Sequence, residues 1–596
     1  MAFSIFYIYK KGFLIMKKRR PMGMTGMILI IIVVSVILTG IILVSYLAKN
    51  AVAKNDDKIL ENAYLTVSEP GTITLYCDGS IYEYEGILEE DFTGVADVVI
   101  SNEKIQKIYA KPDCIDGILI SYTDKVIEVQ GFGELPKGED VPVYSLISGG
   151  VQEVSFDTLV VGNSSLTYVM EEGHICTIIQ KERTRSENIR VLITKKGSAF
   201  HSDMYVTASA DFVCGSENKT AGTWINMKEV LKDTSKAVDL TCEKGMLIIC
   251  NGSSAPESLS QEKMQTICNG DGNFSTGKAY PGQIRIRKED EGFVVVNEVA
   301  IEEYICYVLP SEMPLTFSYE ALKAQAVCAR TVAYSQMKND AYASYGANLD
   351  DTVSYQAYNS AGTGEMAKTG VAETKGQVLS FDGDLMECFY FSTSPGYTEN
   401  LEVWGKEDSP DYLTVKSSIT QKDYTLPAEL STSEGFSAFI HSAPASFDSE
   451  SPYFRWKAVI SLAAGADSEL GKMTGIQITK RSNSGYAVEM KVNYEEDSRT
   501  YSGEGKIRNF LGRCLTTLTL NDGSVRENFS TLPSSCFEVT ATGESSITLT
   551  GGGFGHGIGM SQYGADAMGD AGFTYNGILS FYYTDSKIKL IGELAY

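Results

Sequence analysis

Residues 299–333 read VAIEEYICYVLPSEMPLTFSYEALKAQAVCARTVA. Apolar side chains recur at spacings of three and four between Ile301 and Val308, which is the period of a helix with one buried face. Proline lacks the backbone N–H that a helix interior needs, so we expect this short helix to stop at Pro310.

A second helix is predicted directly after it. Ser318 is a favourable N-cap residue, and Glu320 places a carboxylate in the first turn, where the helix dipole stabilises negative charge. The stretch from Ala321 to Ala333 is rich in alanine and apolar on nearly all sides. Such a composition is typical of a buried helix with close neighbours.

Glu312 lies between the two helices, in the sequence Pro310-Ser311-Glu312-Met313-Pro314. Two prolines four positions apart fix two backbone angles, so we expect a stiff loop. A carboxyl group held among apolar elements has a raised pKa, because burial disfavours the charged form. A general acid that works near neutral pH needs such a pKa. The alternative is an ordinary surface glutamate or a helix cap.

A glycine-rich stretch, GGGFGHGIGMSQYG, occupies residues 551–564. It matches neither a P-loop nor the dinucleotide-binding pattern, so nucleotide binding has little support. Repeated glycines indicate positive φ angles or close backbone approach. Exposed main-chain N–H groups and the imidazole of His556 would suit a polar polymer such as a glycan. A tight structural turn in which His556 is a satisfied hydrogen-bonding group is the alternative.

The stretch FSTSPGYTEN, residues 391–400, is dense in hydroxyl groups and carries a second acid, Glu399. This composition suits a loop that lines a carbohydrate groove, and a plain Ser/Thr-rich turn is the alternative. No nucleophile elbow or Cys-His pair stands out, so acyl chemistry is not supported.

The rest of the outer chain is rich in predicted strands. Alternating segments such as Thr72–Tyr76, Gly117–Tyr122 and Lys125–Val129 predict a small all-β domain over residues 51–185. Further strands are expected over 189–300, and a mixed α+β stretch over 415–550.

The N-terminal 50 residues differ from this acidic body. They carry seven Lys or Arg side chains and no acid, whereas the whole chain has a net charge of −25. Residues 22–47 contain no charge and are long enough to cross a bilayer. The positive-inside rule then predicts a basic cytoplasmic head at 1–21, a single transmembrane anchor at 22–47 and the bulk of the chain outside the cell membrane.

Composition excludes other classes of function. A strongly acidic chain is a poor candidate for a nucleic-acid binder. The 12 cysteines contain no C-x-x-C pair, and there are only four histidines, so we expect no metal site and no cofactor.

Taken in order, these motifs make the chain from about 189 to 596 resemble the SpoIID/LytB family of sporulation glycan-strand lytic enzymes and amidase enhancers. The matching blocks are NEVAIEEY at 297–304, PSEMP at 310–314, EALKAQAVCART at 320–331, TKGQVL at 374–379, the STS…TEN loop at 392–400 with VWG at 403–405, and GFGHGIGMSQYGA at 553–565.

The resemblance implies a lytic transglycosylase that acts on peptidoglycan glycan strands. It implies that Glu312 protonates the glycosidic oxygen between N-acetylmuramic acid and N-acetylglucosamine. The same residue would then take the proton of the muramoyl C6 hydroxyl, which leaves a 1,6-anhydro end. The implied partners are the glycan strands and an N-acetylmuramoyl-L-alanine amidase.

Eight further residues are expected to bind substrate or to support the groove. They are Gln325, Arg330, Ser392, Ser394, Glu399, His556, Gln562 and Tyr563. Gln325 and Arg330 have a structural alternative, since both are polar residues on a helix that we expect to be buried.

The predicted fold class is therefore α+β: a single N-terminal transmembrane helix, a small all-β domain over 51–185, and a mixed SpoIID-type domain over 189–596. Two other functions remain open. One is a non-catalytic amidase enhancer or glycan-binding protein, and the other is a hydrolase that pairs Glu312 with Glu399.

Overall fold

The computed structural model describes residues 58–594, apart from 70, 86–91, 148, 163–165, 183–186, 233–235, 339, 359–362, 407, 427 and 528. The chain divides into two compact units. The smaller unit combines the chain before residue 116 with Pro142–Val154 and Tyr168–Ile179, and the larger unit contains Asp116–Val141, Ser155–Thr167 and the chain from Gln180 onward.

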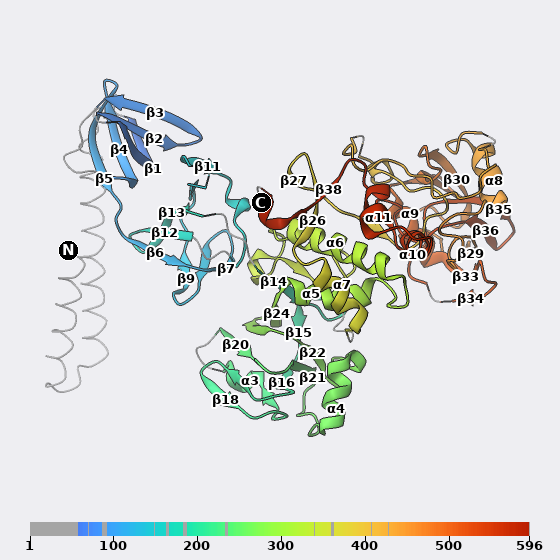
Figure 1. Cartoon of the computed structure of the whole chain (residues 1–596), viewed down its shortest axis with the longest axis horizontal. Helices are drawn as coiled ribbons and strands as arrows, with labels where there is room; N and C mark the ends of the chain where they lie inside the picture. Colours follow the sequence, from blue (N-terminus) through green and yellow to red (C-terminus); the bar gives the residue numbers. More distant parts are fainter. Residues whose placement is uncertain are drawn as a thin grey trace. The chain divides into compact units, whose positions relative to one another are not determined.

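The smaller unit is built on an antiparallel sheet (Figure 1). Its strand order is β3-β2-β1-β4-β5. The strands are β1 (Lys58–Glu69), β2 (Thr72–Cys77), β3 (Ser80–Glu85), β4 (Gly94–Ser101) and β5 (Lys104–Ala110). Alternate residues such as Leu65, Leu75 and Val98 point into one apolar core, because successive side chains of a strand face opposite sides of the sheet.

Two further sheets follow in the chain. One has the order β11-β10-β13-β12-β6, and the other has the order β7-β8-β9. Their strands are β6 (Cys114–Gly117), β7 (Leu119–Tyr122), β8 (Val126–Val129), β9 (Gly133–Pro136), β10 (Val143–Ser145), β11 (Gln152–Val154), β12 (Leu166–Glu171) and β13 (His174–Gln180). β2, β7 and β8 confirm the three strands that the alternation predicted.

Besides the β7-β8-β9 sheet, the larger unit contains two more sheets early in the chain, ordered β18-β17-β20-β23-β24-β14-β25 and β19-β16-β21-β22. Their longest strands are β14 (Asn188–Ile193), β23 (Gln283–Glu289) and β24 (Gly292–Ala300). The shorter ones are β15 (Phe200–His201), β16 (Met204–Ala208), β17 (Phe212–Cys214), β18 (Glu217–Lys219), β19 (Ile225–Asn226), β20 (Ala237–Thr241), β21 (Leu247–Asn251), β22 (Lys278–Tyr280) and β25 (Leu349–Asp350). The short helices α3 (Met227–Val230) and α4 (Gln261–Thr266) join them.

Helices gather around α6 (Tyr319–Gln336). It packs against α5 (Ile301–Glu312), α7 (Glu365–Glu373), α10 (Gln562–Asp570) and α11 (Tyr575–Tyr582) (Figure 1). Most of α6 is buried, as its alanine-rich composition predicts. Ser318 is confirmed as its N-cap residue, but its side chain donates to the backbone carbonyl of Asp566 at 3.1 Å and does not cap α6 itself.

The remaining elements are mostly strands. The sheet β34-β33-β29-β36-β35 and the sheet β30-β31-β32 enclose a separate apolar core that includes Trp456, Met490 and Leu549. The strands are β26 (Gln377–Phe381), β27 (Asp384–Leu385), β28 (Tyr390–Phe391), β29 (Trp456–Ser461), β30 (Met473–Arg481), β31 (Ala487–Tyr494), β32 (Ser498–Ser502), β33 (Leu515–Leu520), β34 (Val525–Arg526), β35 (Phe537–Thr542), β36 (Ser546–Gly551), β37 (Met560–Ser561) and β38 (Lys587–Leu590), with helices α8 (Ser433–Ser442) and α9 (Glu504–Cys514).

One predicted helix end is wrong. α5 does not stop at Pro310 but continues to Glu312, and its C-cap is Met313. Pro310 occupies the last turn, so its missing N–H removes only one hydrogen bond near the end of the helix. Glu312 is therefore the terminal residue of a helix and not the centre of a loop.

The predicted fold class is also corrected. Strands dominate the described residues, and the helices are concentrated around α6 and in a few isolated elements. A mixed α+β domain over 189–596, strand-rich over 189–300, was expected because the helical motifs are the easiest to recognise; the short strands between them carry weaker signals.

The predicted membrane anchor finds no support. Within residues 58–594 as described, no helix is both long and apolar enough to cross a membrane. The predicted segment 22–47 and the basic head at 1–21 lie outside the described residues. The single-pass cell-membrane location that was inferred from them is withdrawn with the anchor.

Candidate functional site

Glu312 is held at the C-terminus of α5 by one backbone hydrogen bond. The N–H of Ala357 donates to its Oε1 at 2.6 Å. Burial raises the pKa of Glu312 above the ordinary value for glutamate, and the Ala357 N–H opposes that shift in part because it favours the charged form. The side chain therefore has the character that a general acid requires.

Two phenols lie close to Glu312, that of the fully buried Tyr304 and that of the half-buried Tyr390. Burial raises the pKa of both Tyr304 and Tyr390, and the negative charge of Glu312 raises each of them further. Gln356 links them, because its Oε1 accepts from the hydroxyl of Tyr304 at 3.3 Å and its Nε2 donates to that of Tyr390 at 3.2 Å. Tyr390 opens β28, which leads directly into the hydroxyl-rich loop at 392–400.

The hydroxyl-rich and glycine-rich loops lie side by side. β28 pairs with β37 in parallel, and Thr393 and Phe554 exchange two backbone hydrogen bonds of 3.0 and 2.8 Å. The N–H of Glu399 donates to the carbonyl of Gly557 at 2.7 Å. The two motifs, about 160 residues apart in sequence, therefore form one element of the larger unit.

Glycine is required in this loop for close packing. Gly557 and Gly559 both have positive φ, at 86° and 77°. A Cβ at Gly559 would lie 2.0 Å from the carbonyl oxygen of Phe389, and one at Gly557 would lie 2.6 Å from the ring of Tyr486. The prediction of positive φ and close approach is confirmed. Several of the N–H groups that we expected to be exposed instead donate within the protein.

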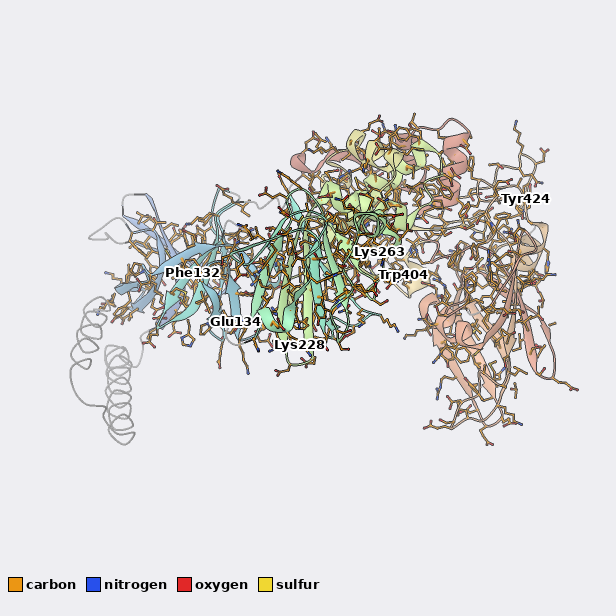
Figure 2. The ribbon with its side chains drawn as sticks, turned by 90° about the horizontal axis from the view of Figure 1, so that it is seen from below. Phe132, Glu134, Lys228, Lys263, Trp404 and Tyr424 are labelled. Carbon is orange, nitrogen blue, oxygen red and sulfur yellow. The ribbon has the colours of Figure 1, made fainter. Side chains whose placement is uncertain are left out.

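His556 is enclosed by aromatic rings. Its imidazole lies 5.3 Å from the ring of Trp404, labelled in Figure 2, and 5.7 Å from that of Phe391. Nδ1 accepts the N–H of Ile558 at 3.0 Å, so a neutral ring carries its proton on Nε2. Burial lowers the pKa of His556 to about 4, and the imidazole is neutral at physiological pH.

Glu399 is almost fully buried, with 1% of its surface exposed. Its Oε2 accepts from the hydroxyls of Ser482 and Ser484, and its Oε1 accepts from the N–H of Asn400 at 2.9 Å. Burial raises its pKa to about 7, and these three donors oppose the shift. Its carboxyl group therefore joins the 392–400 loop to the turn after β30.

The two predicted serines differ in their surroundings. Ser394 is fully buried, and its N–H donates to Oδ1 of Asp448 at 2.8 Å. Ser392 is half-buried, and its carbonyl accepts the N–H of Tyr563 at 3.0 Å. Asp448 also accepts from the hydroxyl of Ser561, so one buried carboxyl group fastens both loops.

Gln325, Gln562 and Tyr563 meet on the α6–α10 side. Nε2 of Gln562 donates to Oε1 of Gln325 at 3.4 Å. The ring of Tyr563 packs edge-on against Phe317 at 4.9 Å, and Phe317 follows Glu312 by five residues. These contacts bring the segment after Glu312 to the start of α10.

Arg330 has a different environment from the other predicted residues. Its guanidinium is fully buried and forms a two-pronged ion pair with Glu302, at 2.9 and 2.7 Å. It also donates to the carbonyls of Gln377 and Val371, at 3.0 and 3.3 Å. These partners belong to α5, α7 and β26, so Arg330 fastens elements around α6.

Sequence reasoning missed Gln356, Ala357, Tyr390 and Asp448. Tyr390 stands one residue before the recognised loop, and its place beside that motif was a usable signal. The others are single residues in unremarkable segments, and nothing in their sequence neighbours indicates what they contact.

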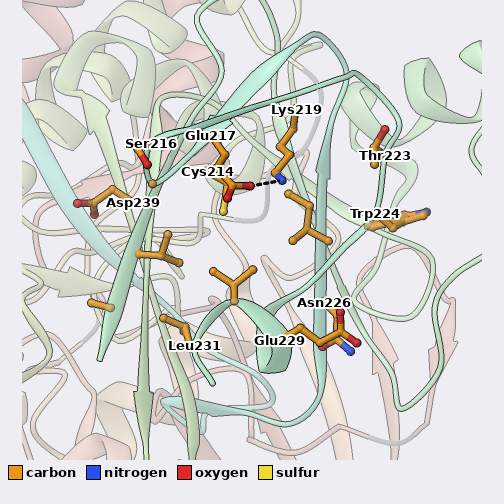
Figure 3. Close-up of a pocket in the computed structure, with 15 residues that line it drawn as sticks. Cys214, Ser216, Glu217, Lys219, Thr223, Trp224, Asn226, Glu229, Leu231 and Asp239 are labelled. Atoms are coloured by element: carbon orange, nitrogen blue, oxygen red, sulfur yellow. Dashed lines mark hydrogen bonds and ion pairs between the residues drawn. The ribbon is translucent and has the colours of Figure 1, made fainter. Parts of the chain in front are cut away.

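A separate cavity of 840 Å³ lies in the strand-rich part of the larger unit (Figure 3). Its lining includes Cys214, Glu217, Lys219 and Trp224, and Glu217 pairs with Lys219 at 2.5 Å. None of the residues of the Glu312 site lines it. Among the residues that the structure describes, no group of three or more His, Cys, Asp or Glu side chains is placed to hold a metal ion.

Comparison with known proteins identifies the family. Residues 289–381, which contain Glu312, match the model of the SpoIID family, described as stage II sporulation protein. The chain is 31% identical over 308 residues to stage II sporulation protein D of Bacillus subtilis strain 168; the match covers 49% of this chain and 76% of that protein. The protein of the same name from Bacillus amyloliquefaciens is 32% identical, with 49% and 75% covered.

An amidase enhancer of Bacillus subtilis strain 168 is 30% identical over 301 residues. That match covers 47% of this chain but only 39% of the enhancer. With the family model spanning Glu312 and three quarters of a 31% identical relative covered, this chain belongs to the SpoIID family.

Proposed function

We propose that this protein is a lytic transglycosylase that cleaves peptidoglycan glycan strands between N-acetylmuramic acid and N-acetylglucosamine. Membership of the SpoIID family supports a role at the cell wall. The observation that carries the activity is the state of Glu312: a carboxyl group with a raised pKa, anchored through Oε1 alone. Glu312 is half-buried, and within the described part of the chain no hydrogen bond to its Oε2 is present, so Oε2 is the oxygen that we assign to the substrate.

One carboxyl group serves both chemical steps. Protonated Glu312 donates its proton to the glycosidic oxygen, the bond to C1 of the muramoyl residue breaks, and the N-acetylglucosamine side leaves as an alcohol. The carboxylate then accepts the proton of the C6 hydroxyl as its oxygen attacks C1. The product is a 1,6-anhydro end, no water is consumed, and the second acid of ordinary glycosidases is not needed.

The buried position of Glu399 favours this scheme over hydrolysis. A second catalytic carboxylate has to reach the sugar or its attacking water. Glu399 is 1% exposed, and both its oxygens accept hydrogen bonds from protein groups. A hydrolase that pairs Glu312 with Glu399 would produce reducing ends, and the buried position of Glu399 argues against that pairing.

A second candidate is a non-catalytic enhancer of an N-acetylmuramoyl-L-alanine amidase. The similarity to the Bacillus subtilis amidase enhancer favours it. The two candidate functions differ in whether they require Glu312, because only the enzyme needs the proton of its carboxyl group. An amidase is the proposed partner in both cases.

The two candidates are separated by one experiment on the purified full chain. Glycan strands with and without stem peptides are digested, and an amidase reaction is run with and without the protein. The transglycosylase predicts 1,6-anhydro ends in the absence of amidase. Stimulation of the amidase that survives Glu312→Gln, with no cleavage of either strand preparation, would establish the enhancer instead.

A further inference from the structure

We infer that Gln356 is a positioning residue for Glu312: it fixes the backbone N–H of Ala357 that holds the acid. This inference rests on the proposed role of Glu312. Gln356 does not contact the carboxyl group itself, and it acts through the peptide unit that it shares with Ala357.

Gln356 is anchored on three sides. Its Nε2 donates to the carbonyl of Ala329 in α6 at 3.2 Å and to the hydroxyl of Tyr390 in β28 at 3.2 Å. Its Oε1 accepts from the hydroxyl of Tyr304 in α5 at 3.3 Å. The side chain is fully buried, so no solvent molecule replaces a lost partner without rearrangement.

These anchors leave the peptide between Gln356 and Ala357 little freedom. A primary amide has two N–H donors, and both are used here; its orientation is therefore set by three different elements. The N–H of Ala357 follows directly in the chain and points at Oε1 of Glu312, 2.6 Å away. Tyr358, one residue further on, is held separately from these anchors: its hydroxyl donates to Oδ1 of Asn297 at 2.8 Å.

The arrangement serves the acid in two ways. It orients the carboxyl group so that Oε2 is the oxygen left for substrate, which is a requirement for proton transfer in a defined direction. It also stabilises the carboxylate that must form after the first step. Without the side-chain amide of Gln356, the N–H of Ala357 would no longer be held toward Oε1 of Glu312. The charged form of Glu312 would then lose its one strong donor.

The test variant is Gln356→Met, which keeps the length of the side chain and removes its hydrogen bonds. Tyr358→Phe is the matched control, since it removes one buried hydrogen bond from the same segment without touching the anchors of Gln356. We expect Gln356→Met to lower kcat by roughly tenfold with little change in KM. The alkaline limb of its pH profile should move upward by about one pH unit. Tyr358→Phe should leave the limb in place.

A second readout needs no substrate. In protein labelled with ¹³C-glutamate, the infrared band of the protonated carboxyl of Glu312 is isolated by subtracting the spectrum of Glu312→Gln. Its titration should shift upward in Gln356→Met. If Gln356→Met does not fold, Tyr304→Phe, which removes the donor to Oε1 of Gln356, should shift the titration in the same direction by a smaller amount.

The outcomes separate the two proposals. If wild type cleaves no glycan, the proposed function fails, and the infrared titration still decides whether Gln356 positions Glu312. If Gln356→Met folds and its titration and kcat match those of wild type and Tyr358→Phe, the inference is wrong whatever the activity of the chain.

Discussion

The backbone N–H of Ala357 lies 2.6 Å from Oε1 of Glu312, and it joins the end of α5 to a segment 45 residues later in the chain. Burial raises the pKa of this glutamate, and the single hydrogen bond limits the rise. A carboxyl group in this state is protonated over a wider pH range than a surface glutamate, yet it becomes a stabilised carboxylate once its proton has been used.

Activity should therefore be lost on the alkaline side. The first step needs protonated Glu312, so kcat should be level at low pH and fall tenfold per pH unit above the pKa of that group in the complex. Because burial raises this pKa, the limb should lie above the ordinary glutamate value of about 4.3. Initial rates on purified strands at constant ionic strength measure it. A profile whose limb lies at or below that value would count against Glu312 as the acid.

Arg330 should matter for stability. Replacing it with Met leaves Glu302 without its ion pair and removes the donor to the carbonyls of Ala326, Gln377 and Val371. This change should lower the free energy of unfolding by about 3 kcal/mol. Thermal unfolding followed by circular dichroism measures the change. Lys368→Met is the control, because Lys368 pairs with Glu365 on the surface at 3.6 Å and its loss should have no measurable effect. Equal unfolding temperatures for both variants would show that the buried pair does not stabilise the fold.

The helices that carry Glu312 and Arg330 show what the sequence predicts well. The period and composition of 299–333 predicted two helices, and α6 begins and is buried as expected. The end of α5 was misplaced because the general rule for proline does not distinguish the last turn from the interior. The large share of strand was underestimated, since many strands here have only two to five residues and show little alternation.

The site was predicted in part. Glu312, His556 and the two loop motifs were recognisable, and their glycines indicated close packing. The roles of Gln356, Ala357 and Asp448 depend on contacts between segments far apart in the chain, which no local pattern reports. For the same reason the N–H groups of the glycine-rich loop were expected to face a ligand, whereas several of them donate to backbone carbonyls of other segments, among them those of Cys536, Tyr453 and Pro533.

Glu399 should make stability depend on pH. Its folded-state pKa is raised to about 7 by burial, so the folded protein holds this proton more tightly than the unfolded chain. The stability it contributes is present at low pH and lost as pH rises from about 4.5 to about 7, a difference of about 3 kcal/mol. The free energy of unfolding of Glu399→Gln, measured with denaturant, should therefore increase relative to that of wild type as pH rises through this window.

The exposed Glu365→Gln is the matched control for Glu399, because the side chain of Glu365 is 91% exposed. It should follow wild type at every pH. Parallel pH curves for wild type and Glu399→Gln would contradict the buried, partly protonated state of this carboxyl group.

His556 should remain neutral where an ordinary histidine gains charge. Burial among aromatic rings lowers its pKa to about 4. In protein labelled with ¹³C,¹⁵N-histidine, the ring signals of His556, assigned by their absence in His556→Asn, should not change between pH 5 and pH 8. A midpoint near 6.5 would mean that the imidazole is open to solvent and available to a ligand.

The most direct test of the central claim is to identify the glycan ends that form with and without the carboxyl group of Glu312. Purified glycan strands are incubated with the full wild-type chain and with Glu312→Gln, after both are shown to unfold at the same temperature, and the ends are identified by mass spectrometry. The account predicts 1,6-anhydro-muramoyl ends with wild type and a loss of at least about 100-fold with the variant. Anhydro ends produced equally by both proteins, or reducing ends from wild type, would contradict it.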